Sequence, residues 1–152
     1  MNLAIPLSAY NPKNIFLCGR VRNTIVENST FARLLFSNHY MTTIGIHLQL
    51  SVVGAIDEPY YQKLRTIFKV EQDNEAMVRQ VVNIENSILD LAETGKSRVT
   101  KLSDQLRNGI LRSSASANWQ TNGQNFVLKI TGIWETDTEC GVTYKVSDAT
   151  RL

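Results

Sequence analysis

Phe126-Val-Leu-Lys-Ile-Thr-Gly-Ile-Trp-Glu-Thr-Asp-Thr-Glu-Cys-Gly-Val-Thr-Tyr-Lys-Val146 is the stretch that decides the fold of this 152-residue chain. Two runs of largely alternating apolar and polar residues flank a polar turn, and this pattern predicts a β-hairpin. Hairpins of this kind close small antiparallel barrels. We therefore expect residues 124–147 to form the closing hairpin of a sheet.

Alternation within the hairpin also predicts which side chains enter the core. If both strands are regular, Trp134 and Tyr144 lie with the apolar side chains, and Lys129 and Lys145 lie on the opposite sides. We therefore favour Trp134 and Tyr144 as core residues over a role as stacking platforms. An irregular strand at Gly132 is the alternative, because it would rotate Trp134 outward.

Residues 15–53 predict a meander of three strands. The first covers residues 15–22, the second covers residues 31–36, and the third begins at Thr42 with strict alternation. Its apolar side carries Ile44, Ile46, Leu48, Leu50 and Val52, and its polar side carries Thr43, Gly45, His47, Gln49 and Ser51. One apolar and one polar face is typical of an antiparallel sheet that is open on one side.

Residues 54–123 read as a helical insert followed by a loop. We expect a short helix over residues 60–68, and a longer one, capped by Asp73 or Asn74, whose apolar residues recur every three or four positions over residues 77–91. Gly95 suits the left-handed position after that helix. A further helix follows and stops near Asn108-Gly109.

The order of three strands, a helical insert and two strands predicts an α+β fold. It matches a five-stranded antiparallel barrel of the oligonucleotide/oligosaccharide-binding (OB) type, with an enlarged helical insert between strands 3 and 4. An α+β sandwich with helices on one sheet face is the alternative. The length is typical of a single domain over residues 1–152.

Charge is unevenly distributed, although the net charge is only +2. Residues 1–56 carry a net charge of +3, residues 70–94 carry −5, and residues 96–112 carry +4. A solvated helix face accounts for the acidic block. The basic early strands instead suggest a surface that meets phosphates.

The early strands and the hairpin together suggest a surface for single-stranded nucleic acid. In OB barrels the face of strands 2 and 3 contacts the ligand, with cations on phosphates and aromatic rings against bases. A solvated face with scattered charges is the alternative. The candidates are Arg20, Arg22, Arg33, Lys129 and Lys145 for phosphates, Phe31, Tyr40, Trp119 and Trp134 for stacking, and His47 and Gln49 as polar neighbours.

Other classes of function have less support. Neither His39 nor His47 has partners at metal-ligand spacing, and neither Cys18 nor Cys140 has an activating residue nearby in sequence. A nucleophile elbow and a Gly-rich phosphate loop are both missing from the sequence. We therefore expect no enzyme activity and no cofactor. The basic helix after Gly95 resembles a helix-turn-helix only in outline.

Composition favours an intracellular protein without membrane association. Residues 1–6 have no basic region before Pro6, unlike a signal peptide, and no window reaches about 18 apolar residues. Two cysteines on separate predicted strands favour free thiols in a reducing compartment.

A resemblance to a small family found across nucleocytoplasmic large DNA viruses covers residues 15–147. It is carried by Phe31-Ala-Arg-Leu-Leu-Phe-Ser37, Thr43-Ile-Gly-Ile-His-Leu48, Ile130-Thr-Gly-Ile-Trp-Glu135 and Gly141-Val-Thr-Tyr-Lys145. The hairpin also resembles the closing strands of phage and viral single-stranded DNA-binding proteins of OB fold. This chain departs from them in its small net charge and in lacking an acidic C-terminal tail.

These resemblances imply a non-catalytic viral protein that binds single-stranded nucleic acid, with DNA favoured, during replication or transcription. It would act in the host cytoplasm or nucleus, and packaging in the virion is left open. The alternative is a structural or interaction protein, such as a minor virion component or a subunit of a viral replication or transcription assembly. In that case the apolar stripe of residues 77–91 would bind a protein partner or a second copy of the chain.

Overall fold

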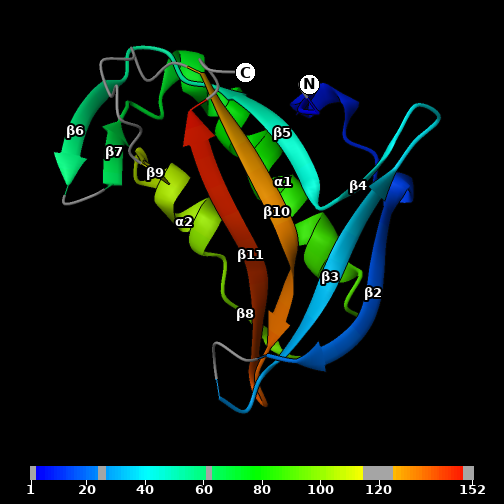
Figure 1. The fold of residues 1–152 in the computed structure, drawn as a ribbon. Coiled ribbons are helices and arrows are strands. Elements are labelled where there is room, and N and C mark those ends of the chain that lie inside the picture. Colours follow the sequence, from blue (N-terminus) through cyan, green and yellow to red (C-terminus); the bar gives the residue numbers. More distant parts are fainter. Residues whose placement is uncertain (1–2, 24–26, 61–62, 115–124, 149–152) are drawn as a thin grey trace.

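The computed structural model describes residues 3–23, 27–60, 63–114 and 125–148, and its centre is one long, mixed β-sheet (Figure 1). Its strands are arranged around a central hairpin, and only the pairings of the two shortest strands are parallel. The strands of this sheet are β1 (Ile5–Pro6), β2 (Ile15–Arg22), β3 (Thr30–Ser37), β4 (Thr42–Ile44), β5 (Ile46–Ser51), β8 (Ser97–Arg98), β10 (Asn125–Glu135) and β11 (Glu139–Asp148).

Over the described residues, the main sheet has seven strand pairings. Five of them are antiparallel, and the pairings of β1 with β5 and of β8 with β11 are parallel. A smaller antiparallel sheet consists of β6 (Ile56–Tyr60), β7 (Lys63–Ile67) and β9 (Ile110–Ser114). Short 3-10 turns cover Leu7–Ala9, Pro12–Asn14 and Gln72–Asn74.

Strand β10 organises the main sheet because it has different partners along its length. On one side it pairs with β11 throughout, and on the other it pairs first with β5 and then with β3. Gly45 allows this change: its φ of 77° turns the chain between β4, which pairs with β3, and β5, which pairs with β10. A side chain is strained at such a φ, so glycine suits this position.

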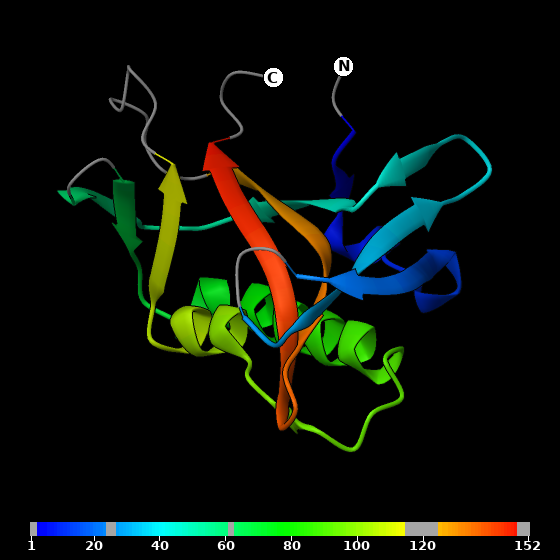
Figure 2. The ribbon, with the colours of Figure 1, turned by 60° about the horizontal axis from the view of Figure 1, so that its bottom comes forward.

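Both helices, α1 (Glu75–Asp90) and α2 (Lys101–Arg107), lie against one face of the main sheet (Figure 2). The stripe over residues 77–91 is a core face, because Val81 and Ile88 are fully buried. They pack with the apolar side chains of β5 and β10. The idea that this stripe binds a protein partner is therefore wrong, since the sheet already covers it.

The expected α+β class is confirmed, and the helices cover one sheet face as the sandwich alternative predicts. Among the described residues, no strand pairing closes the main sheet into a barrel. The closing hairpin is present as β10 and β11. The expected three-strand meander is present only in part, because β2, β3 and β4 pair in sequence, whereas β5 leaves β3 and pairs with β10.

Three local expectations for the insert are wrong. Residues 60–68 contain the end of β6 and all of β7 instead of a helix, because pairing with β9 overrides local preference. The left-handed position after α1 is Glu93, with a φ of 50°, and not Gly95. Asn74 occupies the N-cap position of α1 as expected, but the expected side-chain cap is missing, because this side chain bonds the backbone of Val53 and Lys69.

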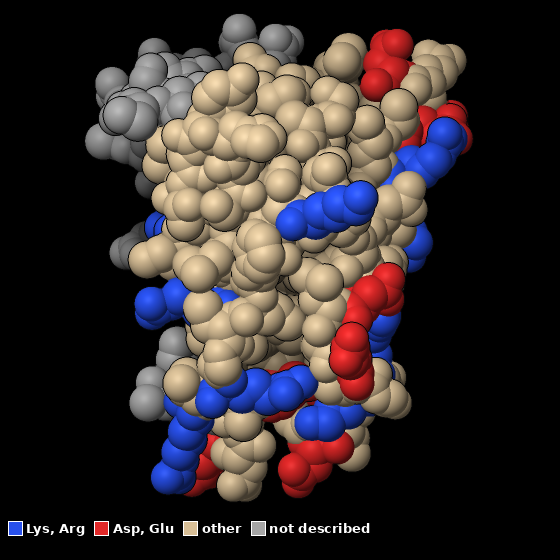
Figure 3. Space-filling view, turned by 90° about the vertical axis from the view of Figure 1, so that its right-hand side faces the viewer, with Lys and Arg blue, Asp and Glu red and all other residues tan. Residues whose placement is uncertain are grey.

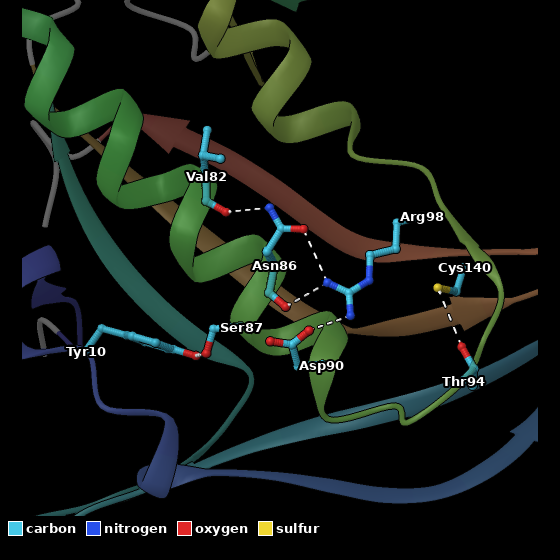
Figure 4. A network of polar contacts seen from close by, with 8 residues as sticks. All are labelled: Tyr10, Val82, Asn86, Ser87, Asp90, Thr94, Arg98 and Cys140. Atoms are coloured by element: carbon cyan, nitrogen blue, oxygen red, sulfur yellow. Dashed lines mark hydrogen bonds and ion pairs between the residues drawn. The ribbon is translucent and has the colours of Figure 1, made fainter.

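Hydrogen bonds and an ion pair connect the segment after α1 to that helix (Figure 4). Arg98 donates to the backbone and side-chain oxygens of Asn86, both at 3.3 Å, and forms an ion pair with Asp90. Arg98 lies in β8 and not in a helix, so the basic helix expected after Gly95 begins only at Lys101. No helix in the described part of the chain is long and apolar enough to span a membrane.

Candidate nucleic-acid interface

The face of the main sheet opposite the helices is uncovered by any helix (Figures 1 and 2), and we call it the open face. Residues directly opposite each other in paired strands point to the same face. Lys129 lies opposite both His47 and Lys145, and Trp134 lies opposite both Phe31 and Gly141. The open face is thus made of Phe31 and Arg33 of β3, His47 and Gln49 of β5, Lys129, Gly132 and Trp134 of β10, and Gly141, Thr143 and Lys145 of β11.

A β-bulge in β10 brings Trp134 to this face. The register with β11 shifts between Ile130 and Gly132, so that Thr131 is an extra residue. One extra residue reverses the facing of every later side chain in the strand. The favoured expectation of Trp134 in the core is therefore wrong, and the alternative of an irregular strand at Gly132 is confirmed.

Tyr144 stays on the helix side, as regular alternation in β11 predicts. It packs against the core, and its hydroxyl accepts a hydrogen bond of 2.6 Å from Gln105 Nε2. Burial raises the pKa of the Tyr144 hydroxyl.

The two aromatic rings of the open face lie over glycines of neighbouring strands. A Cβ at Gly132 would stand 2.5 Å from Phe31 Cζ, and a Cβ at Gly141 would stand 2.7 Å from Trp134 Cζ2. The rings can approach the sheet this closely only because glycine has no side chain. Each ring is half-buried, with one part against the sheet and the rest accessible.

The cations of the open face have no acidic partner. Arg33, Lys129 and Lys145 form no ion pair with a carboxylate in the described part of the chain. Lys129 and Lys145 lie directly opposite each other, an arrangement of like charges that costs stability in a sheet. An anion between them would relieve that repulsion.

His47 lies next to these cations and is affected by them. Burial lowers the pKa of the His47 imidazole, and the positive charge of Lys129 lowers it further. The Nδ1 atom of His47 is buried and has no hydrogen-bond partner among the described residues. His47 is therefore a neutral polar neighbour at pH 7.

Arg20 and Arg22 do not join this surface. In the β2–β3 register they lie opposite Ala32 and Thr30, on the helix side of the sheet. Arg20 forms an ion pair with the buried Glu135 and donates to the carbonyl oxygen of Ala92 at 3.0 Å. The expectation that Arg20 and Arg22 converge with Arg33 is wrong, because alternation in β3 separates positions 30 and 32 from 33.

The remaining candidates are dispersed. Tyr40 is 93 % exposed at the tip of the β3–β4 hairpin, where Asn38 accepts a hydrogen bond from its backbone N–H. Gln49 lies on the open face, and its side chain donates to the carbonyl oxygen of Ala4 at 3.1 Å. Trp119 lies outside the described residues.

Sequence reasoning missed an apolar extension of the open face. Phe16, Val21 and Ile44 are each more than half exposed, at 52 %, 60 % and 56 %. Their partners in the β2–β3 and β3–β4 registers are Leu35 and Phe31, both of which point to the open face. The side of the molecule that β2, β3 and β4 form shows a wide area without charged side chains (Figure 3). Ile44 was expected inside, and the turn at Gly45 reverses its facing.

Comparisons with protein-family models, curated proteins and solved structures found no match for this chain. The resemblance to proteins of large DNA viruses and to phage and viral single-stranded DNA-binding proteins therefore stays a prediction.

Proposed function

We propose that this protein binds single-stranded nucleic acid, with DNA favoured, across the open face of its main sheet. The observation that carries the proposal is the placement of two half-buried aromatic rings and three cations on one face of the sheet, where none of the three cations forms an ion pair with a described residue. Aromatic rings stack bases of any sequence, and cations bind the phosphates between them.

The layout of the open face supports this assignment. Phe31 and Trp134 lie side by side at one end, and Lys129 and Lys145 lie at the other. Positions 141 and 145 of β11 are about 13 Å apart along the strand. A single-stranded nucleic acid lying along β11 would place its bases on the aromatic end of the open face and its phosphates on the cationic end. We propose no catalytic role for this surface.

Fluorescence anisotropy of a labelled poly-thymidine oligomer tests the proposal. We expect binding at low salt that weakens as salt rises, because cations bound to phosphates release counterions. The Lys129→Gln/Lys145→Gln variant should bind more weakly, with a shallower salt dependence by about 0.7 per lost phosphate contact. An apparent Kd above about 100 μM at low salt contradicts the proposal.

A matched control separates local contacts from loss of net charge. Arg79→Gln removes a positive charge from the exposed side of α1, where Arg79 pairs with Glu75 at 3.0 Å. This variant should keep nearly all of its affinity. Trp134→Leu should weaken binding by about 1–3 kcal/mol if a base stacks on the indole.

The second candidate is a structural or interaction protein, and the exposed Phe16, Val21 and Ile44 favour it. Among the described residues, β3 is the only strand that pairs with β2, so the outer edge of β2 offers backbone groups to another chain. A second copy of the chain, or a viral protein partner, would then cover this area. Light scattering discriminates, since a stable oligomer indifferent to oligonucleotide favours this candidate over the first.

The OB-like barrel, the viral role and the cellular location are parts of the same proposal. An OB-like barrel is supported by the order of strands, helices and hairpin, and not by any strand pairing among the described residues. A role in viral replication or transcription, an intracellular location and packaging in a virion rest on the resemblances alone.

A further inference from the structure

A second polar surface lies at the edge of β11, where α2 and β9 meet it. A pocket of about 370 Å³ is lined there by Lys101 and Gln105 of α2, Arg112 and Ser113 of β9, and Tyr144 and Lys145 of β11. Its volume is at the low end of the range for small-molecule sites. Lys145 connects the pocket to the open face, since it also lies opposite Lys129.

The pocket concentrates positive charge. Lys101, Arg112 and Lys145 form no ion pair with a carboxylate of the described residues, and no Asp or Glu is among the residues that line the pocket. Burial raises the pKa of Tyr144, and the carboxylate of Glu85 raises it further, whereas the charge of the Arg112 guanidinium favours the ionised phenol and lowers the pKa. Three cations around one pocket suit a ligand with more than one negative charge.

Two buried polar atoms of the pocket residues have no hydrogen-bond partner in the part of the chain that the structure describes. Ser113 is 3 % exposed, and its Oγ makes no hydrogen bond. Gln105 donates through Nε2 to Tyr144, which leaves Gln105 Oε1 buried and unpaired. Buried polar atoms normally have partners, because an unmade hydrogen bond costs free energy. A ligand that accepts from Ser113 and donates to Gln105 would satisfy both atoms.

We propose that this pocket binds a phosphate monoester attached to a small group that donates a hydrogen bond, as a nucleotide does. The three cations and Ser113 would hold the phosphate, and Gln105 Oε1 would accept from the N–H or O–H of the attached group. The ligand is either a free nucleotide or the phosphorylated end of a single strand. The second source rests on the proposed function.

Two titrations distinguish these sources. The first measures thymidine 5′-monophosphate, thymidine and inorganic phosphate by amide NMR, and the second compares 5′-phosphorylated with 5′-hydroxyl oligothymidylate by anisotropy. We expect the monophosphate to bind more tightly than thymidine, and Lys101→Gln to weaken it about tenfold. Arg107→Gln is the matched control, because Arg107 is on the same helix, is exposed and pairs with Asp104 at 3.9 Å.

Each outcome decides the proposal. A preference for the phosphorylated oligomer that Lys101→Gln abolishes assigns the pocket to strand ends. Binding of the monophosphate alone, lost in Lys101→Gln, supports the pocket as a nucleotide site while the proposed function fails. Equal binding of both oligomers, with no shift on adding the monophosphate, overturns the pocket and leaves the proposed function standing. Equal loss in Arg107→Gln also overturns it, because the effect would then be one of net charge.

Discussion

Lys129 and Trp134 point to the same face of β10, although one position is odd and the other even. The extra residue at Thr131 causes this, and it occurs where β10 changes its neighbour from β5 to β3. The bulge brings the aromatic end and the cationic end of the open face onto one surface. It is therefore the feature on which the proposed function depends most.

Gly141 should be intolerant of a side chain. A Cβ there would stand 2.7 Å from Trp134 Cζ2 and 2.8 Å from the Val99 carbonyl oxygen. We expect Gly141→Ala to displace the indole and to lower the free energy of unfolding by about 1–3 kcal/mol. Denaturant unfolding and near-ultraviolet circular dichroism measure the two effects.

Gly95→Ala is the control for this substitution, because a Cβ at Gly95 meets nothing within 4 Å. It should be neutral or slightly stabilising. An unaltered indole spectrum and unchanged stability in Gly141→Ala would show that Trp134 does not lie over Gly141.

Arg20 should matter for stability and not for binding. Its partner Glu135 is only 4 % exposed, so removing the guanidinium leaves a buried carboxylate without its ion pair. We expect Arg20→Met to lower the free energy of unfolding by about 2 kcal/mol. Oligonucleotide affinity of the folded variant should equal that of the wild type, and a loss comparable to that of Lys129→Gln would contradict the assignment of Arg20 to the helix side.

Glu85 should make the protein less stable as pH rises. Its carboxylate accepts hydrogen bonds from the backbone and hydroxyl of Ser103, but burial outweighs them and raises the pKa of Glu85 above the usual 4.5. The unfolded chain therefore loses this proton first. The contribution of protonated Glu85 to the free energy of unfolding is fully present below pH 4.5 and is lost as pH rises through the folded-state pKa.

Glu85→Gln tests this effect, since glutamine keeps an acceptor for Ser103 and cannot ionise. The variant should be more stable than the wild type at pH 7 and should show a flatter stability profile above pH 4.5. Denaturant unfolding across this range measures both. Lower stability of the variant at pH 7 would mean that the ionised carboxylate is favoured.

His47 should respond to the charge of Lys129. Removing that charge in Lys129→Gln should raise the pKa of His47 toward 6.5, which NMR titration of the imidazole measures. His39, on the β3–β4 turn, serves as the internal control. In the wild type the lowered pKa means that the unfolded chain takes up the proton first, so stability is lost as pH falls below 6.5. An unchanged His47 titration in the variant would exclude this coupling.

Sequence alone determined the hairpin, the pairing of the first two strands and the apolar stripe of α1, because each depends on a local period that burial of one face requires. It also placed Phe31 and Arg33 on one strand face and His47 and Gln49 on another. The spacing of three between Ile130 and Ile133, together with Gly132, was a signal of the bulge. Alternation alone could not decide between a regular strand and a bulged one.

Only the tertiary structure decided which faces meet. The positive φ of Gly45 and the extra residue at Thr131 each reverse the direction in which the side chains of a strand point. As a result, Ile44 and Trp134, respectively, lie on the open face. Pairing with Glu135 took Arg20 away from the other cations. The pocket at β11 joins α2 and β9, which follow each other in sequence, to the more distant β11. Side-chain facing follows a local period only while the strand keeps one partner, and here the partner of β10 changes.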